Sequence, residues 1–296
     1  MYRSLRDAIR DAEARSMTLA TLALETEARD QGRPVGEIRA ALARALEVMR
    51  GAIAQGLTGE HKSASGLVGG DAAKLRTGPP GPLADTLFRD VLARALAVQE
   101  INAAMGVIVA APTAGGAGVL PAVLTGIADA RTLGDDALVD ALATAGLIGA
   151  IIADRASLSG AEGGCQAETG AAAAMAAGAA TEMLGGTPAQ VGHATALAQQ
   201  GTLGLVCDPL GGLVELPCVF RNATGAAIAL AAVEMALAGI SFAIPADEVI
   251  DTMGDIGREM DVRYRETAGG GLAATPTGRR LAKERLVQIK RSGGRP

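Results

Sequence analysis

The segment from residue 163 to residue 184 constrains the fold more than any other part of this chain. Residues 171–180 are Ala-Ala-Ala-Ala-Met-Ala-Ala-Gly-Ala-Ala. Alanine has the highest intrinsic helix propensity, so a helix is expected here. A helix that is apolar on every face has to be buried. The sequence leaves open whether it is buried inside the chain or against a partner.

The composition extends this argument to the whole chain of 296 residues. Hydrophobic residues make up 49% of it, but aromatic residues only 2%, and there are 40 glycines and no tryptophan. The core must therefore consist of Ala, Leu, Val, Ile and Met, whose small volumes let helices approach closely. No segment shows a convincing strand pattern. We predict an all-α fold in which residues 1–296 form one large helical domain. Helices are expected over 5–30, 34–55, 85–105, 119–130, 135–154, 163–184, 189–201, 219–239, 247–261 and a final charged segment.

Three glycine-rich segments interrupt this helical pattern. They span residues 58–82, 111–118 and 262–278. Long irregular segments in compact domains are often functional. In the first, Ser63, Ser65 and the amide of Gly66 are candidate donors to an anion. The second precedes a helix, so its backbone N–H groups form either an anion site or a tight turn between helices.

Several functional classes are disfavoured by charge and patterning. The net charge is −5 and the isoelectric point about 5.2, whereas nucleic-acid binding needs a basic surface. Residues 101–128 are uncharged for longer than a bilayer span, but prolines and glycines interrupt them, and unwound backbone in lipid is costly. The first ten residues contain no apolar signal core. We therefore expect no membrane or nucleic-acid partner and a cytoplasmic location.

The chain has only three cysteines, and each lies beside glycine or proline at the edge of an expected helix. They are Cys165, Cys207 and Cys218, separated by 42 and 11 residues. Disulfides are not expected in a reducing compartment. The spacing matches no compact zinc motif, and the only histidines are His61 and His193. An iron–sulfur cubane held by three thiolates and a set of inert buried cysteines both remain open.

Six sequence motifs resemble the α subunit of the iron–sulfur-dependent L-serine dehydratases, also called L-serine ammonia-lyases. Three contain the cysteines, and the other three lie in the glycine-rich segments. They are Gly-Gly-Cys-Gln-Ala-Glu (163–168), Gly-Leu-Val-Cys-Asp-Pro (204–209), Pro-Cys-Val-Phe-Arg-Asn (217–222), Ser-Gly-Leu-Val-Gly-Gly-Asp (65–71), Ala-Pro-Thr-Ala-Gly-Gly (111–116) and Tyr-Arg-Glu-Thr-Ala-Gly-Gly-Gly-Leu-Ala (264–273).

The resemblance implies an all-helical chain that converts L-serine to pyruvate and ammonia. It implies a [4Fe–4S] cluster on Cys165, Cys207 and Cys218, with one iron open as a Lewis acid for loss of the β-hydroxyl. Arg221 is expected either to clamp the substrate carboxylate or to hold its loop. The expected substrate-binding residues are Lys62, Ser63, Ser65, Thr113, Gly115 and Asn222.

The resemblance also has gaps. Single-chain members carry a β portion with a Ser-Ser-Ser-His-Thr signature that this sequence lacks. A separate β chain is therefore expected to complete the site and supply the catalytic base, for which His61 is the candidate on this chain. Some members of the family end in a cysteine that reaches back to the cluster, but this sequence ends Gly-Gly-Arg-Pro, so no such tail ligand is expected. Separately, the chain is expected to form an oligomer. The alternatives are a related lyase for another β-substituted amino acid, or a non-catalytic helical subunit with buried cysteines.

Overall fold

The computed structural model describes residues 2–79, 81 and 86–291, including the side chains up to residue 285. Parts of two sequence predictions lie outside the described residues: Pro80 and Pro82 of the segment 58–82, and the final Gly-Gly-Arg-Pro. Within them every long element is a helix, which confirms the all-α prediction. The helices are α1 (Leu5–Ala14), α2 (Leu19–Gln31), α3 (Val35–Gly56), α4 (Asp71–Thr77), α5 (Thr86–Ala103), α6 (Val119–Arg131), α7 (Asp135–Arg155), α8 (Gly160–Gly163), α9 (Ala171–Met183), α10 (Pro188–Gln200), α11 (Cys218–Leu237), α12 (Ala246–Glu259) and α13 (Pro276–Arg291).

The alanine-rich helix α9 lies at the centre of the core. All residues from Ala171 to Thr181 are buried, and α9 packs against α6, α7, α10 and α11. Its small side chains allow these close approaches. A methyl group added at Gly178, for example, would lie 2.4 Å from Cδ1 of Ile148. The sequence left open what buries this helix, and the structure shows that the same chain does.

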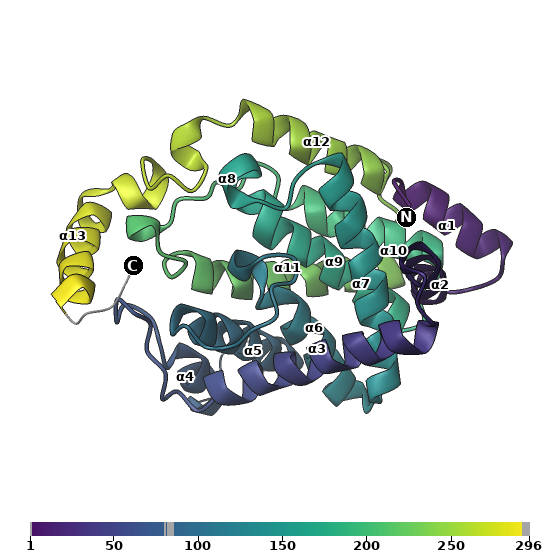
Figure 1. The fold of residues 1–296 in the computed structure, drawn as a ribbon, viewed down its shortest axis with the longest axis horizontal. Coiled ribbons are helices and arrows are strands. Elements are labelled where there is room, and N and C mark those ends of the chain that lie inside the picture. Colours follow the sequence, from purple (N-terminus) through teal and green to yellow (C-terminus); the bar gives the residue numbers. More distant parts are fainter. Residues whose placement is uncertain (1, 80, 82–85, 292–296) are drawn as a thin grey trace.

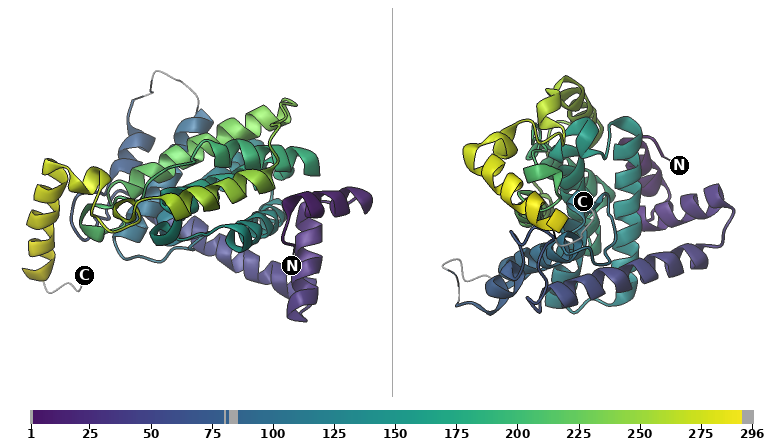
Figure 2. Two further views of the ribbon diagram at one scale, coloured as in Figure 1. Left: turned by 90° about the horizontal axis from the view of Figure 1, so that it is seen from above. Right: turned by 60° about the vertical axis from the view of Figure 1, so that its left-hand side comes forward.

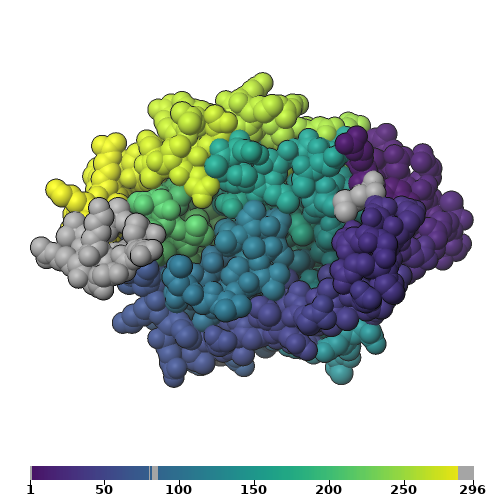
Figure 3. Space-filling model, in the orientation of Figure 1, coloured from purple at the N-terminus to yellow at the C-terminus, as the bar shows by residue number. Residues whose placement is uncertain are grey.

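The other helices are arranged around this centre. In Figure 1, α12 runs along one edge and α3 along the opposite edge, with α1 and α13 at the two ends. The views in Figure 2 also place α13 and α1 at opposite ends. The space-filling view shows segments from the middle of the chain filling the region between α3 and α12 (Figure 3).

The helix predicted over residues 5–30 is wrong, because the chain forms two helices there. Ser16 has a left-handed backbone conformation, with φ of 51°. Thr18 then caps α2, accepting a hydrogen bond from the amide of Thr21 at 3.1 Å. A capping threonine offers the backbone an alternative to a continuous helix. The short helix α4 was also not predicted.

Carboxylates from distant helices, two of them buried and that of Glu182 half-buried, cap three of the helix N-termini. Asp247 accepts from the amides of Leu5 and Arg6, and Glu182 from those of Leu19 and Ala20. Glu100 accepts from the amides of residues 70–72 at the start of α4. A negative charge at this position pairs with otherwise unsatisfied N–H groups and with the helix dipole.

Two helices, α7 and α11, are long and apolar enough to cross a membrane by length and composition alone. In the described part of the chain, 67% of the most apolar 18-residue stretch of α7 is buried, and 44% of that of α11. Mostly buried core helices of soluble proteins have the same length and composition. The interrupted segment 101–128, considered from the sequence, is not among the candidate spans.

Candidate functional site

The three cysteines come from three different junctions between helices. Cys165 follows α8 and begins a π-helical turn over Gln166–Gly170, a local distortion that is frequent at functional sites. Cys207 lies in the extended segment after α10, and Cys218 is the first residue of α11. The expected helix over 163–184 therefore begins regular α-geometry only at Ala171.

All three thiols are buried, and none forms a disulfide. The residues are 1%, 2% and 3% exposed for Cys165, Cys207 and Cys218. Burial raises the pKa of all three thiols, and that of Cys218 reaches about 12. After burial, the largest influence that raises the pKa of Cys207 and of Cys218 is the charge of Cys165. The thiols are therefore close enough to affect one another.

This arrangement does not suit a single metal ion. No group of three or more His, Cys, Asp or Glu side chains in the described part of the chain is arranged to hold one ion. Nδ1 of His193 instead accepts a hydrogen bond from the amide of Phe242 at 3.3 Å.

Glu168 lies between the cysteines and the segment 111–118. Its carboxylate accepts a hydrogen bond from the Thr113 hydroxyl at 2.7 Å and one from Sγ of Cys207 at 3.9 Å. Burial raises the pKa of this carboxyl group, and the hydrogen bond from Thr113 opposes that shift. A methyl group at Gly115 or Gly160 would lie within 2.8 Å of a Glu168 carboxylate oxygen, so a larger residue at either position would require this carboxylate to move.

The segment after α12 pairs with Cys207 through the backbone. The amide of Cys207 donates to the carbonyl of Tyr264, and the amide of Glu266 donates to the carbonyl of Cys207, both at 2.8 Å. This is an isolated bridge between Cys207 and Arg265. One residue further on, the carboxylate of Asp208 accepts from the amide of Leu272 at 2.6 Å. The predicted glycine-rich segment 262–278 is thus attached directly beside a cysteine.

The segment 111–118 is attached to α11 by Asn222. Its side-chain oxygen accepts from the amide of Gly118 at 2.9 Å, and its amide group donates to the carbonyls of Gly115 at 2.7 Å and Cys218 at 2.9 Å. Asn222 is fully buried. Of its neighbours, the amide of Gly116 also has a partner, the carbonyl of Thr113. Asn222 therefore fixes this glycine-rich segment, which lies in the connection between α5 and α6, to the start of α11.

The polar segment 58–82 is attached to the loop between Cys207 and Cys218. Glu215 accepts from both the amide and the hydroxyl of Ser65. The hydroxyl of Ser63 accepts from the amide of Val68 at 3.3 Å, and the amide of Gly66 donates to the carbonyl of Ser63 at 2.9 Å. The expected donors Ser63, Ser65 and Gly66 are therefore engaged within the protein.

The remaining expected residues differ in accessibility. Lys62 is exposed, whereas His61 and Thr113 are partly exposed. The guanidinium of Arg221 pairs with Asp208 at 2.8 Å and donates to the carbonyl of Val206 at 2.8 Å. Of the two roles expected for Arg221, the structure shows the one in which it holds the loop that contains Cys207.

Sequence reasoning missed the acidic residues Glu168, Asp208 and Glu215. Two of them stand in the motifs that contain Cys165 and Cys207, three residues and one residue after the cysteine. That proximity was the available signal. Their partners lie 55 to 150 residues away in the sequence, so no local pattern identified what they would bind.

Comparison with known proteins agrees with this arrangement. The family model described as "Serine dehydratase alpha chain" matches residues 14–273. A protein of Bacillus subtilis described as "Probable L-serine dehydratase, alpha chain" is 45% identical over 288 residues, which cover 96% of this chain and 95% of the relative. The "L-serine dehydratase, alpha chain" of Peptoniphilus asaccharolyticus is 39% identical over 97% of this chain and 99% of the relative. The "L-serine dehydratase" of Streptomyces coelicolor is 42% identical over 92% of this chain, but only 60% of that longer relative is covered. The match spans all three cysteine segments and the loops attached to them, and this chain belongs to the serine dehydratase alpha chain family.

Proposed function

We propose that this chain is the α subunit of an L-serine dehydratase that converts L-serine to pyruvate and ammonia. The observation that carries the proposal is the convergence of three buried cysteines with the segments 59–71, 111–118 and 266–275. It occurs in a chain that matches α chains of L-serine dehydratases over nearly its whole length.

We propose that Cys165, Cys207 and Cys218 hold a [4Fe–4S] cluster. Metal ligation needs thiolates, yet the pKa of each thiol is raised by burial and by negative neighbours, so positive charge must compensate. When bound, a cluster on three protein thiolates leaves one iron open, which supplies a Lewis acid for departure of the β-hydroxyl. The conversion of serine to pyruvate and ammonia needs no net electron transfer.

The expected substrate-binding residues divide into two groups by accessibility. We propose that Lys62, which is exposed, and Thr113, which is partly exposed and whose hydroxyl also donates to Glu168, contact the substrate. The polar groups of the other four residues instead hold the loops through hydrogen bonds; these residues are Ser63, Ser65, Gly115 and Asn222. Thr113 is linked to Cys207 through Glu168, and the segment that carries Lys62 is attached by Ser65 to the loop between Cys207 and Cys218. Positioning of this kind is a large part of catalysis.

We propose that a separate β chain supplies the base that removes the Cα proton. Two relatives are described as α chains, and the longer Streptomyces relative has room for a further region in the same chain. Of the polar residues on this chain, His61 is the candidate that would replace such a base.

The experiment is expression of the chain with and without its candidate β chain, followed by anaerobic iron–sulfur reconstitution. Iron and acid-labile sulfide near four each per chain and serine-dependent pyruvate formation are expected. Activity on threonine or cysteine instead of serine would favour the related lyase. A chain that binds neither iron nor sulfide would be the non-catalytic subunit, and zinc without sulfide would indicate a structural metal site.

A further inference from the structure

A pocket of about 310 Å³ lies between α8, α12 and the C-terminal end of α7. Its floor includes Gly163 and Ala167, two residues before and two after Cys165, but none of the three cysteines lines it. Its volume is at the lower end of the range for small-molecule sites.

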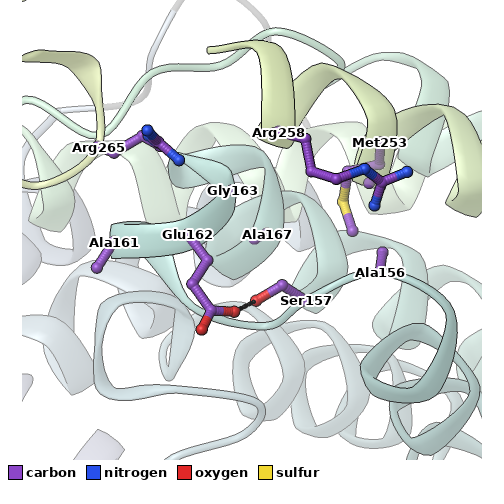
Figure 4. A pocket seen from close by; sticks show the side chains of 11 residues that line it. Ala156, Ser157, Ala161, Glu162, Gly163, Ala167, Met253, Arg258 and Arg265 are labelled. Carbon is purple, nitrogen blue, oxygen red and sulfur yellow. Dashed lines mark hydrogen bonds between the residues drawn. The ribbon is translucent and has the colours of Figure 1, made fainter. Parts of the chain in front are cut away.

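The charged groups of the pocket are arranged on two sides. Figure 4 shows the guanidinium groups of Arg258 and Arg265 along one side and the Glu162–Ser157 pair along the other. The Ser157 hydroxyl donates to the Glu162 carboxylate at 2.6 Å. Other lining residues, such as Ala156, Ala161 and Gly254, are small, so the space between the two sides is not filled by side chains.

Arg265 is the group in this pocket that lacks a partner. Its Nε atom is buried and has no hydrogen-bond partner. A buried N–H of a charged group that makes no hydrogen bond is costly. A ligand carboxylate would satisfy it, and guanidinium groups bind carboxylates through paired, charge-assisted hydrogen bonds.

The opposite side decides which anion fits. Glu162 is negative and would repel a dianion such as phosphate, but it would attract an ammonium group. Arg258 already pairs with Asp255, so the charges around the pocket are nearly balanced. We propose that this pocket binds a small zwitterionic α-amino acid, with its carboxylate at Arg265 and its ammonium at Glu162. The short lining residues limit its side chain to a few atoms.

Such a ligand would lie against residues on both sides of Cys165. It would restrain the segment 163–167 and so stabilise the position of one cysteine without contacting it. The proposed dehydratase activity is not needed for this inference, because amino-acid binding is measured without turnover.

The test is calorimetric titration of the full-length, reconstituted chain with L-alanine, which carries both charged groups but has no β-hydroxyl to lose. Saturable binding is expected. Arg265→Gln should weaken it at least tenfold, and Ala161→Leu, which fills the pocket from an exposed position, should do the same. Arg263→Gln is the matched control, since Arg263 is exposed, pairs with Asp261 and does not line the pocket; it should bind as the wild type does.

Pyruvate and inorganic phosphate test the second half of the proposal. Both lack an ammonium group and should bind at least tenfold more weakly than L-alanine. Absence of saturable L-alanine binding, or equal binding by the wild type, Arg265→Gln and Ala161→Leu, would overturn the site. Equally tight binding of pyruvate would overturn the assignment to an amino acid. Iron content measured on the same samples keeps this outcome separate from failure of the proposed cluster.

Discussion

Glu215 accepts hydrogen bonds from both the backbone amide and the hydroxyl of Ser65, 150 residues away in the sequence. Both residues are about 95% buried. The contact joins the loop between two cysteines to the polar segment that carries Lys62. Several long-range hydrogen bonds of this kind attach the loops around the cysteines. The contribution of each to the free energy of unfolding can be measured separately.

The Ser65–Glu215 pair should contribute to stability as a coupled unit. Ser65→Ala and Glu215→Gln should each lower the free energy of unfolding by about 2 kcal/mol, because hydrogen bonds to a buried carboxylate are strong. The double variant should cost about 1 kcal/mol less than the sum, since both changes remove the same charged hydrogen bond between the Ser65 hydroxyl and the Glu215 carboxylate. Urea denaturation of the four proteins measures this. Thr58→Ala, on an exposed residue nearby, is the control, and strict additivity would contradict the coupling.

Asn222→Ala should act by releasing the segment 111–118 from α11. It removes three hydrogen bonds at a fully buried position, and a loss of about 3 kcal/mol in unfolding free energy is expected. In the active enzyme, kcat should fall more than tenfold while the KM for serine changes little. A rise in KM with kcat preserved would instead show that Asn222 contacts the substrate.

Two glycines with positive φ provide a matched pair. A methyl group at Gly271 would lie 2.1 Å from Oδ2 of Asp208, whereas one at Gly212 would meet no atom within 4 Å. Gly212→Ala should therefore cost only about 1 kcal/mol for its backbone conformation. Gly271→Ala should cost at least about 3 kcal/mol, because Asp208 or the loop has to move. Equal unfolding temperatures of the two variants would show that Asp208 and the loop around Gly271 can move without loss of stability.

Stability should depend on pH through Glu182. Burial raises the pKa of this carboxyl group in the folded protein, although hydrogen bonds from Thr144 and the start of α2 oppose the shift. The folded state therefore binds the proton more tightly than the unfolded chain does. The contribution of Glu182 to the free energy of unfolding is fully present below its unfolded pKa of about 4.3. It is lost as the pH rises through the pKa of Glu182 in the folded protein.

Glu182→Gln removes that ionisation and should flatten the decline in unfolding free energy above the usual glutamate pKa. Chemical denaturation of both proteins at a series of pH values measures how the free energy of unfolding depends on pH. Glu248→Gln on the exposed surface is a suitable control. An unchanged pH profile in Glu182→Gln would assign the dependence to other groups.

Single changes of the cysteines should remove the proposed cluster. Cys165→Ser, Cys207→Ser and Cys218→Ser should each retain less than about a tenth of the reconstituted iron, because hydroxyl groups do not replace thiolate ligands. Serine is close in size, so circular dichroism should show the helical fold intact. Full iron and sulfide content in any of the three variants would exclude that cysteine as a ligand.

The amino-acid sequence determined the helical class and the identity of the buried centre. A run of alanines without a polar face can only be a buried helix, and a core without aromatic residues favours close helix packing. The helix expected over 189–201 likewise corresponds to α10, at whose start the structure shows a capping box formed by Thr187 and Gln190. Local residues sufficed because helix propensity and capping are local properties.

Other features were decided only by the tertiary structure. The break at Ser16 depends partly on Glu182, which caps α2 from 163 residues away. The roles of Asn222, Arg221 and Glu215 depend on partners that long-range packing brings to them, and a hydrogen bond between distant residues leaves no periodic pattern in the sequence. The sequence therefore indicated which side chains could perform chemistry, and the packing of the helices determined which of them hold the loops and which remain accessible.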